Sequence, residues 1–361
     1  MILTVVGARP NFMKAAPIHR AFERAGVEHG LLHTGQHYDE AMSRVFFEDL
    51  GMPRPIVDLG VGSGTHAQQT AAVMVGVEQY FTRQRPRAVL VVGDVNSTLA
   101  ASVVAAKMGI YCAHVEAGLR SNDWAMPEEV NRAVTDAVSD LLLTPSADAD
   151  RNLLAEGCPP ESIVRVGNVM IDTLLEHLPR ARALDVPGRL GLGPGGYAVL
   201  TLHRPSNVDD PAVFQGLLTA VAKIARRLPV VFPVHPRTRQ RAAAAGYDLA
   251  SFPGLLPIDP LGYLEFLSLT SRARLVLTDS GGLQEESTVL GIPCLTLREN
   301  TERPITVEQG TNGVVGTRPE VVEAAAAEAL DRPPGGARRV PELWDGKAAE
   351  RIVEAVRARI G

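Results

Sequence analysis

The sequence has few cysteines and no apolar run long enough to cross a membrane. Its three cysteines among 361 residues, Cys112, Cys158 and Cys294, lie far apart and lack the spacing of metal ligands. This usage fits a reducing cytoplasm and argues against a disulfide framework. The first apolar run, residues 2–6, is too short for a signal peptide or a membrane span. The sequence therefore predicts a soluble, cytoplasmic protein.

The chain also lacks any long basic run. Its 36 lysines and arginines are outnumbered by 41 acidic residues, and the net charge is −5. Nucleic acid is therefore not expected as a partner. A content of 45% hydrophobic and 21% charged residues is typical of a globular protein, and the length suffices for two domains.

Short apolar runs alternate with helical periodicity along almost the whole chain, without an internal repeat beyond this pattern. Such alternation is typical of parallel sheets covered by helices on both faces. A dozen strands are too many for one compact sheet, so the prediction is two doubly wound α/β domains. The predicted strands are 2–6, 30–34, 88–92, 111–115, 141–144, 163–166, 198–202, 230–234, 255–257, 275–278, 293–297 and 313–315. The predicted helices include 41–50, 67–82, 99–108, 213–226, 320–330 and 347–360.

The domain change is expected near residues 167–190. The least apolar segment, 180–196, has the composition of a linker followed by a turn. We therefore predict an N-terminal domain over 1–175 and a C-terminal domain over 176–345. The last helix, within 346–361, is free to pack on either domain, including back on the N-terminal one.

The stretch RLVLTDSGGLQEE combines a strand, a glycine-containing turn and a helix start. Backbone N–H groups at such a start attract anions, and Gly281 and Gly282 let the backbone approach a phosphate. Glu286 is suited to accept hydrogen bonds from a ribose diol. These features indicate a nucleotide diphosphate site. The alternative is a capped helix in which Ser280 serves only the helix terminus.

Polar side chains also follow the first two predicted strands, where a doubly wound sheet places its ligands. Arg9 and Lys14 come after the first strand and are candidates for phosphate contacts, although two solvated cations would look the same. Gln36 and His37 follow the second strand and could bind a sugar or a base. A lone histidine there could equally be structural.

Three acids lie at strand or helix ends within about forty residues. Asp94 and Glu116 each follow a strand, and Glu128 opens a predicted helix that also carries Arg132. Each acid alone has an ordinary explanation, such as helix capping. Together in one cleft they would acquire the shifted pKa values that acid–base chemistry uses.

The second half of the chain adds groups that complement these acids. His203 and His235 each follow an apolar run, and either could be structural. Arg303 is the kind of bidentate donor that a diphosphate needs.

The motifs GARP with Lys14, TGQH, GDVNST, HVEAGLRS, PEEVNR, His203-Arg204, PVHP, TDSGGLQEE and ENTERP occur in this order. The chain thereby resembles the non-hydrolysing UDP-N-acetylglucosamine 2-epimerases over nearly its whole length. The resemblance implies the GT-B architecture, in which two Rossmann-like domains face each other across a cleft. It also implies a UDP-sugar substrate, a homodimer, and neither a redox cofactor nor a metal.

The implied reaction eliminates UDP across the C1–C2 bond and adds it back to a trapped 2-acetamidoglucal with C2 inverted. Preorganised donors would stabilise the departing diphosphate. The implied acid–base groups are Asp94, Glu116 and Glu128, with His203 near the diphosphate or aiding proton transfer. The implied UDP site comprises Arg9, Lys14, Ser280, Gly281, Gly282, Glu286 and Arg303, with Phe266 at the uracil. Arg132 and His235 are expected to contact sugar or phosphate.

The chain departs from the common bacterial pattern at Asn11, at Pro205-Ser206 and in residues 62–70. Regulation by a second UDP-sugar therefore cannot be carried over. Related motifs also occur in enzymes acting on UDP-2,3-diacetamido-glucuronic acid. Three other interpretations stay open: a hydrolysing epimerase, a GT-B glycosyltransferase and a catalytically silent sensor. The three acids argue against the last two.

Overall fold

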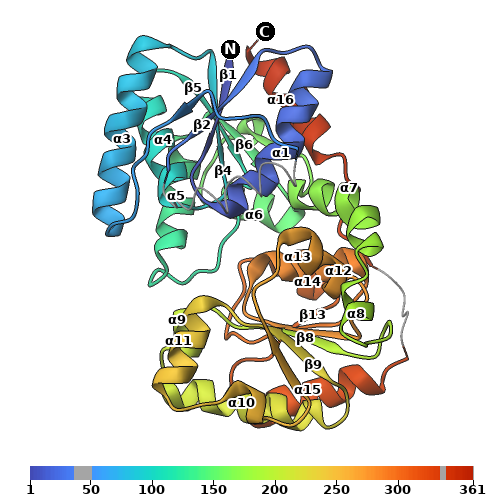
Figure 1. Ribbon diagram of the computed structural model, residues 1–361. Helices are drawn as coiled ribbons and strands as arrows, with labels where there is room; N and C mark the ends of the chain where they lie inside the picture. Colours follow the sequence, from blue (N-terminus) through green and yellow to red (C-terminus); the bar gives the residue numbers. More distant parts are fainter. Residues whose placement is uncertain (36–50, 334–338, 361) are drawn as a thin grey trace. The chain divides into compact units, whose positions relative to one another are not determined.

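The computed structural model describes residues 1–35, 51–333 and 339–360, and it divides into two compact units (Figure 1). Unit 1 comprises Met1–Thr173 together with Glu342–Gly361, and unit 2 comprises Leu174–Pro341. Each unit contains one parallel sheet with helices around it. The predicted fold class, two doubly wound α/β sheets, is confirmed.

Unit 1 is built on a seven-stranded sheet with the order β3-β2-β1-β4-β5-β6-β7. All its pairings are parallel, and Ile2 pairs with both His29 and Ala88. Since β1 is central and fully buried, it needs the uninterrupted apolar run that the sequence supplies. The strands are β1 (Ile2–Val6), β2 (His29–His33), β3 (Val57–Asp58), β4 (Ala88–Val92), β5 (Tyr111–Val115), β6 (Leu141–Thr144) and β7 (Ile163–Arg165).

The last helix of the chain belongs to the core of unit 1. In α16, Ile352 and Val356 are fully buried in the cluster that contains Phe22 of α1 and Leu90 of β4. Its first turn is capped by Asp172 of α7, whose carboxylate accepts the N–H groups of Ala348 and Ala349 at 3.1 and 2.7 Å. The helices of unit 1 are α1 (Arg9–Arg24), α3 (His66–Arg83), α4 (Asn96–Lys107), α5 (Pro127–Val138), α6 (Ala147–Ala155) and α16 (Ala348–Ile360), and α7 (Val169–Ala183) begins there and continues into unit 2.

Unit 2 is built on a six-stranded parallel sheet with the order β10-β9-β8-β11-β12-β13. The reversal of order at β8 and β11 creates the switch point at which such sheets bind ligands. The strands are β8 (Ala198–Thr201), β9 (Val230–Pro233), β10 (Leu255–Ile258), β11 (Leu275–Thr278), β12 (Cys294–Thr296) and β13 (Asn312–Val314).

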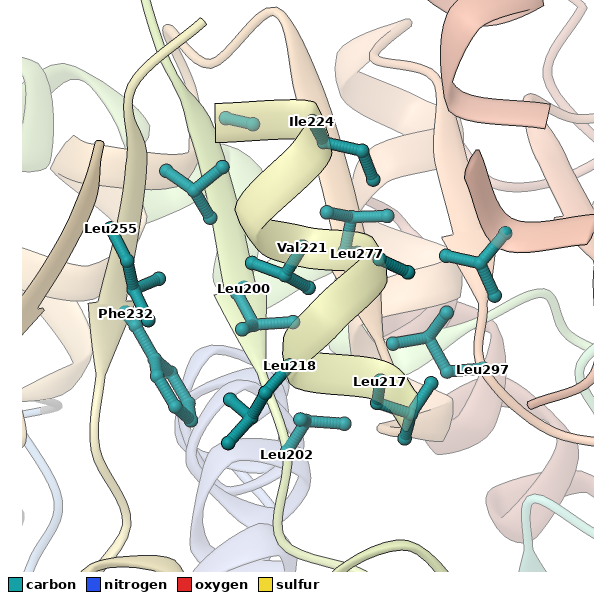
Figure 2. Close-up of a cluster of buried hydrophobic side chains, with 14 of the residues drawn as sticks. Leu200, Leu202, Leu217, Leu218, Val221, Ile224, Phe232, Leu255, Leu277 and Leu297 are labelled. Carbon is teal, nitrogen blue, oxygen red and sulfur yellow. The ribbon is translucent and has the colours of Figure 1, made fainter. Parts of the chain in front are cut away.

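The core of unit 2 forms where α10 packs on its sheet. Figure 2 shows Leu218 and Val221 of α10 beside Leu200, with Phe232 and Leu255 on neighbouring strands. The helices are α8 (Val186–Arg189), α9 (Pro205–Val208), α10 (Pro211–Ala225), α11 (Pro236–Ala244), α12 (Tyr263–Thr270), α13 (Gly281–Leu290), α14 (Ile305–Glu308) and α15 (Pro319–Asp331).

The twelve predicted strands are present, with end shifts of one residue in most cases. The two-residue strand β3 was not predicted, because it contains only one apolar residue and lies at the sheet edge. The segment 180–196, predicted as a linker and turn, begins inside α7 and also contains α8. The predicted helix 41–50 lies outside the described residues.

Candidate active-site residues

Glu116 follows β5 in a left-handed backbone conformation, with φ of 75°. This conformation is uncommon for residues other than glycine and is found preferentially at functional sites. The N–H of Glu116 donates to the carbonyl of Leu143 at 3.0 Å, and its carboxylate is paired with the ammonium of Lys14 from α1. Gly93 has a φ of 72°, a left-handed conformation that favours glycine, and a Cβ there would lie 3.1 Å from Nζ of Lys14. The structure therefore places Lys14 against a carboxylate of unit 1.

Asp94 directly follows Gly93, at the end of β4, and its carboxylate is paired with Arg132 of α5. The same guanidinium donates through Nε and Nη2 to Oε2 of Glu129, at 3.0 and 2.8 Å. Arg132 is only 2% exposed, whereas the Asp94 side chain is 31% exposed. The arginine predicted to contact sugar or phosphate thus holds Asp94 at the edge of the sheet.

The adjacent acids Glu128 and Glu129 have different environments. Glu128 is exposed in the first turn of α5, whereas Glu129 is buried. Glu129 accepts hydrogen bonds from the N–H groups of Ser121 and Asn122, the latter at 2.8 Å. Burial alone would raise the pKa of Glu129, but these hydrogen bonds and Arg132 lower it below its usual value. Glu129 therefore ties the loop after Glu116 to α5 and leaves Glu128 available to a ligand.

A second buried acid stabilises the loops at the same carboxyl edge of the unit 1 sheet. Asp136 of α5 lies 2.6 Å from Nδ1 of His114 and 2.8 Å from Nη2 of Arg120. Burial opposes its ionisation, but His114 and Arg120 outweigh burial and lower its pKa. Nε2 of His114 lies 2.9 Å from the carbonyl oxygen of Gly93. This chain of contacts fixes the backbone that presents Asp94.

In unit 2, α13 begins directly after β11 with Ser280 as its N-cap. The Ser280 side chain makes no capping hydrogen bond, so the interpretation of this residue as a helix cap alone is not supported. A Cβ on Gly281 would come within 2.5 Å of Arg303, whereas a Cβ on Gly282 would meet open space. The N–H groups of the first turn of this ten-residue helix have no intrahelical acceptor. The local geometry suits an anion.

Arg303 is held beside Gly281 by two buried carboxylates. Its Nε lies 2.8 Å from Glu285 and its Nη1 lies 2.5 Å from Glu302. Arg298 also contacts Glu302, at 2.8 Å. Burial would raise the pKa of Glu302, but Arg303, Arg298 and Arg204 together lower it far below its usual range. The result is a fixed cluster of guanidinium groups beside the start of α13.

Glu286 lies one turn into α13 and is 5% exposed. Burial and the neighbouring charge of Glu285 raise the pKa of Glu286 to about 8. Burial, followed by the charge of Glu286, also raises the pKa of Tyr263 well above its usual value. Phe266, one turn further along α12, is partly buried against Val276 and Leu283. A buried carboxyl group near an aromatic residue on the same edge is compatible with binding of a nucleoside.

His203 and His235 of unit 2 lie beside each other after the ends of β8 and β9. Their ring centroids are 6.1 Å apart. His203 has its Nδ1 2.7 Å from Oδ1 of Asp279, and its side chain is 43% exposed. His235 is the N-cap of α11, and its Nδ1 accepts the N–H of Arg237 at 3.3 Å.

Each unit therefore gathers part of the predicted site at the carboxyl edge of its own sheet. Gln36 and His37 lie outside the described residues, and Arg9 is the first residue of α1. Besides Arg9, the predicted residues in unit 1 are Lys14, Asp94, Glu116, Glu128 and Arg132. Those in unit 2 are His203, His235, Phe266, Ser280, Gly281, Gly282, Glu286 and Arg303.

Five buried acids described above were not among the predicted residues, namely Glu129, Asp136, Asp279, Glu285 and Glu302. Asp279 had a usable signal, because it follows the apolar run LVLT directly and a charged residue there cannot easily face solvent. Glu129 and Glu302 lie next to predicted residues but carry no signal of their own.

Comparison with known proteins identifies the family. A family model described as UDP-N-acetylglucosamine 2-epimerase matches residues 20–357. The chain belongs to this 2-epimerase family. UDP-N-acetylglucosamine 2-epimerase of Methanocaldococcus jannaschii is 40% identical over 97% of this chain and 96% of its own length. UDP-2,3-diacetamido-2,3-dideoxy-D-glucuronate 2-epimerase of Pseudomonas aeruginosa is 42% identical over 92% of both chains.

Solved structures agree with this 2-epimerase assignment. The crystal structure of the M. jannaschii enzyme in complex with UDP-GlcNAc and UDP has a TM-score of 0.91 and covers 99% of this chain and 100% of that one. The UDP-GlcNAc 2-epimerase of Neisseria meningitidis bound to UDP-GlcNAc, at 27% identity, has a TM-score of 0.88. The fold is thus GT-B-like, with two parallel α/β sheets. None of the described helices is both long and apolar enough to span a membrane.

Proposed function

We propose that this 2-epimerase family member interconverts UDP-N-acetylglucosamine and UDP-N-acetylmannosamine without releasing the free sugar. The observation that carries this proposal is the set of acids at the carboxyl edge of unit 1. Asp94 and Glu116 are each paired with one cation, and Glu128 is exposed in the first turn of α5, the helix that carries Arg132. Simple glycosyl transfer does not need several acids, whereas moving a proton at C2 does.

The proposed reaction begins with removal of the C2 proton by one carboxylate. The electron pair of that C–H bond forms the C1=C2 double bond, and the C1–O bond breaks with its pair staying on UDP. UDP then adds back at C1, and another carboxyl group delivers a proton to the opposite face of C2. Lys14 and Arg132 hold the carboxylates of Glu116 and Asp94 in position through these ion pairs. We therefore assign proton transfer to Asp94, Glu116 and Glu128.

Unit 2 supplies the proposed diphosphate and nucleoside contacts. The start of α13 and Arg303 would bind the diphosphate, and Glu286 would accept hydrogen bonds from the ribose hydroxyls. His203 is exposed on the same edge and would face the phosphate oxygen that leaves C1. These groups are fixed before substrate arrives, which is the arrangement that stabilises developing charge most effectively.

A second candidate substrate is UDP-2,3-diacetamido-2,3-dideoxy-D-glucuronate. The relative of that name is as similar to this chain as the M. jannaschii enzyme is. The reaction at C2 would be the same, so the two proposals differ only in the sugar.

Proton NMR in heavy water separates these possibilities. We expect UDP-N-acetylglucosamine to yield the manno epimer carrying deuterium at C2, with no free sugar. Release of N-acetylmannosamine and UDP would contradict the non-hydrolysing reaction. An unchanged spectrum, with turnover of the diacetamido-glucuronate instead, would move the proposal to the second substrate.

A further inference from the structure

Asp279, the first residue after β11, has a buried carboxylate whose two oxygens contact different groups. Oδ2 accepts the N–H groups of His203 and Arg204, both at 2.9 Å, and Nδ2 of Asn207 at 3.2 Å. Oδ1 lies 2.7 Å from Nδ1 of His203 and has no other partner among the described residues. The side chain is 0% exposed, so water does not compete for either oxygen.

This geometry determines which nitrogen of His203 carries a proton. At 2.7 Å a nitrogen lone pair facing a carboxylate oxygen would be repelled, so we assign a proton to Nδ1. Nε2 is the nitrogen left to exchange a proton with a ligand, and the side chain is 43% exposed.

In the neighbouring His235, whose ring centroid lies 6.1 Å from that of His203, Nδ1 accepts a hydrogen bond instead of donating one. Its Nδ1 accepts a backbone N–H from Arg237, which is possible only when Nδ1 has no proton of its own. The neutral His235 ring therefore carries its proton on Nε2 and can donate but not accept there. The two neighbouring imidazoles have different proton chemistry because their Nδ1 partners differ.

We propose that Asp279 is a positioning residue that makes His203 a reversible proton carrier toward the leaving diphosphate. This inference rests on the proposed function, since it assigns His203 to the diphosphate. As the C1–O bond breaks, its electron pair stays on the phosphate oxygen, and the Nε2 proton of the His203 imidazolium moves onto that oxygen. When the oxygen attacks C1 again, the proton returns to Nε2.

Asp279 also remains ionised, as this role requires. Burial alone would raise its pKa, but His203 and the two backbone N–H groups outweigh burial and lower it. An ionised, buried carboxylate stabilises the imidazolium that forms when Nε2 is protonated. In the serine-protease triad, a buried aspartate likewise orients a histidine and stabilises its imidazolium form.

The substitution Asp279→Asn tests the proposal because the side chain can be accommodated in only one orientation. The amide oxygen must take the Oδ2 position, where three donors converge, so the amide NH₂ faces Nδ1 of His203. Nδ1 then has to accept, and the ring proton moves to Nε2. Giving up that proton would leave an imidazolate, so the variant can donate a hydrogen bond but cannot transfer a proton.

Two measurements on the whole protein test this expectation, one of the His203 tautomer and one of the reaction rate. In ¹⁵N-histidine NMR we expect a protonated Nδ1 for His203 in the unchanged protein and the Nε2–H tautomer in Asp279→Asn. In the epimerase assay we expect kcat to fall by about 10²- to 10⁴-fold in the variant, with the KM and the affinity for UDP changed by less than about threefold because the charge cluster around Glu302 is intact.

Asn207→Ala is the matched control. It removes one donor from Oδ2 but leaves Oδ1 and His203 in place, so the tautomer should not change even if the protein becomes less stable. An unprotonated Nδ1 in the unchanged protein, or an Asp279→Asn variant with normal kcat, would overturn the proposal. If the unchanged protein turns over neither UDP-sugar, the proposed function fails, and the NMR tautomers still decide the positioning role.

Discussion

The two units share one topology but arrange charge at the carboxyl edge of the sheet in opposite ways. In unit 1 the carboxylates of Asp94 and Glu116 are backed by the buried cations Arg132 and Lys14. In unit 2 the cationic groups are backed by buried carboxylates, with Glu302 beside Arg303 and Asp279 beside His203. A parallel sheet edge can thus present either sign of charge, and the buried partner determines which.

This difference explains why the same fold can supply two kinds of chemistry in one chain. A carboxylate held by a buried cation keeps a fixed position from which it can exchange a proton with a ligand. A cation held by a buried carboxylate stays directed toward an anion and needs no reorganisation when the anion binds. The predictions below remove one partner at a time, from the largest expected effect to the smallest.

Glu116→Gln is expected to lower kcat by about 10²- to 10⁴-fold, because an amide cannot exchange the proton that a carboxylate does. UDP affinity, measured by titration calorimetry, should change by less than about threefold, since the diphosphate and nucleoside contacts proposed in unit 2 are unchanged. Asp94→Asn should behave in the same way. A normal rate in either variant would remove that acid from the mechanism.

Glu302→Gln is expected to destabilise unit 2 by about 3–5 kcal/mol, because two buried guanidinium groups would lose their shared carboxylate. Denaturant unfolding measures this loss. Glu299→Gln, an exposed acid in the same segment, is the control and should change stability by less than about 0.5 kcal/mol. Equal stability of the two variants would show that the buried partner does not hold the cluster.

Glu286→Gln is expected to make stability less dependent on pH. Since folding raises the pKa of Glu286 to about 8, the folded state binds a proton that the unfolded chain releases at a lower pH. This contribution is fully present below the unfolded pKa and is lost as pH rises toward 8, by about 1.4 kcal/mol for each unit of the pKa difference. Unfolding curves of both proteins across this range measure the difference, and parallel pH profiles would contradict the assignment.

The sequence predicted most of the fold because buried strands need continuous apolar runs. Leu275–Thr278 was predicted with its observed ends, since every residue of this strand is buried. Helix starts were predicted late where the first turn is polar: α4 begins at Asn96 and not at residue 99. Periodicity detects apolar residues and misses a first turn of buried Asn, Ser and Thr.

The site was only partly predictable, because its partners are distant in sequence. Motif order brought Asp94, Glu116 and Glu128 together, yet nothing in the sequence distinguishes the exposed Glu128 from the buried Glu129. Asp279 accepts hydrogen bonds from residues that precede it by more than seventy positions in the sequence. Such pairings depend on the order of the strands in the sheet, so only the structure reveals them.

The position of α16 also has a consequence for synthesis of the chain. Ile352, Val353 and Val356 fill the core of unit 1, although they follow the whole of unit 2 in the sequence. During translation, unit 2 can therefore complete its core while unit 1 still lacks a helix. A ribosome stalled after residue 341 would leave an apolar groove beside α1 uncovered, and chaperones would meet the nascent N-terminal unit in that form.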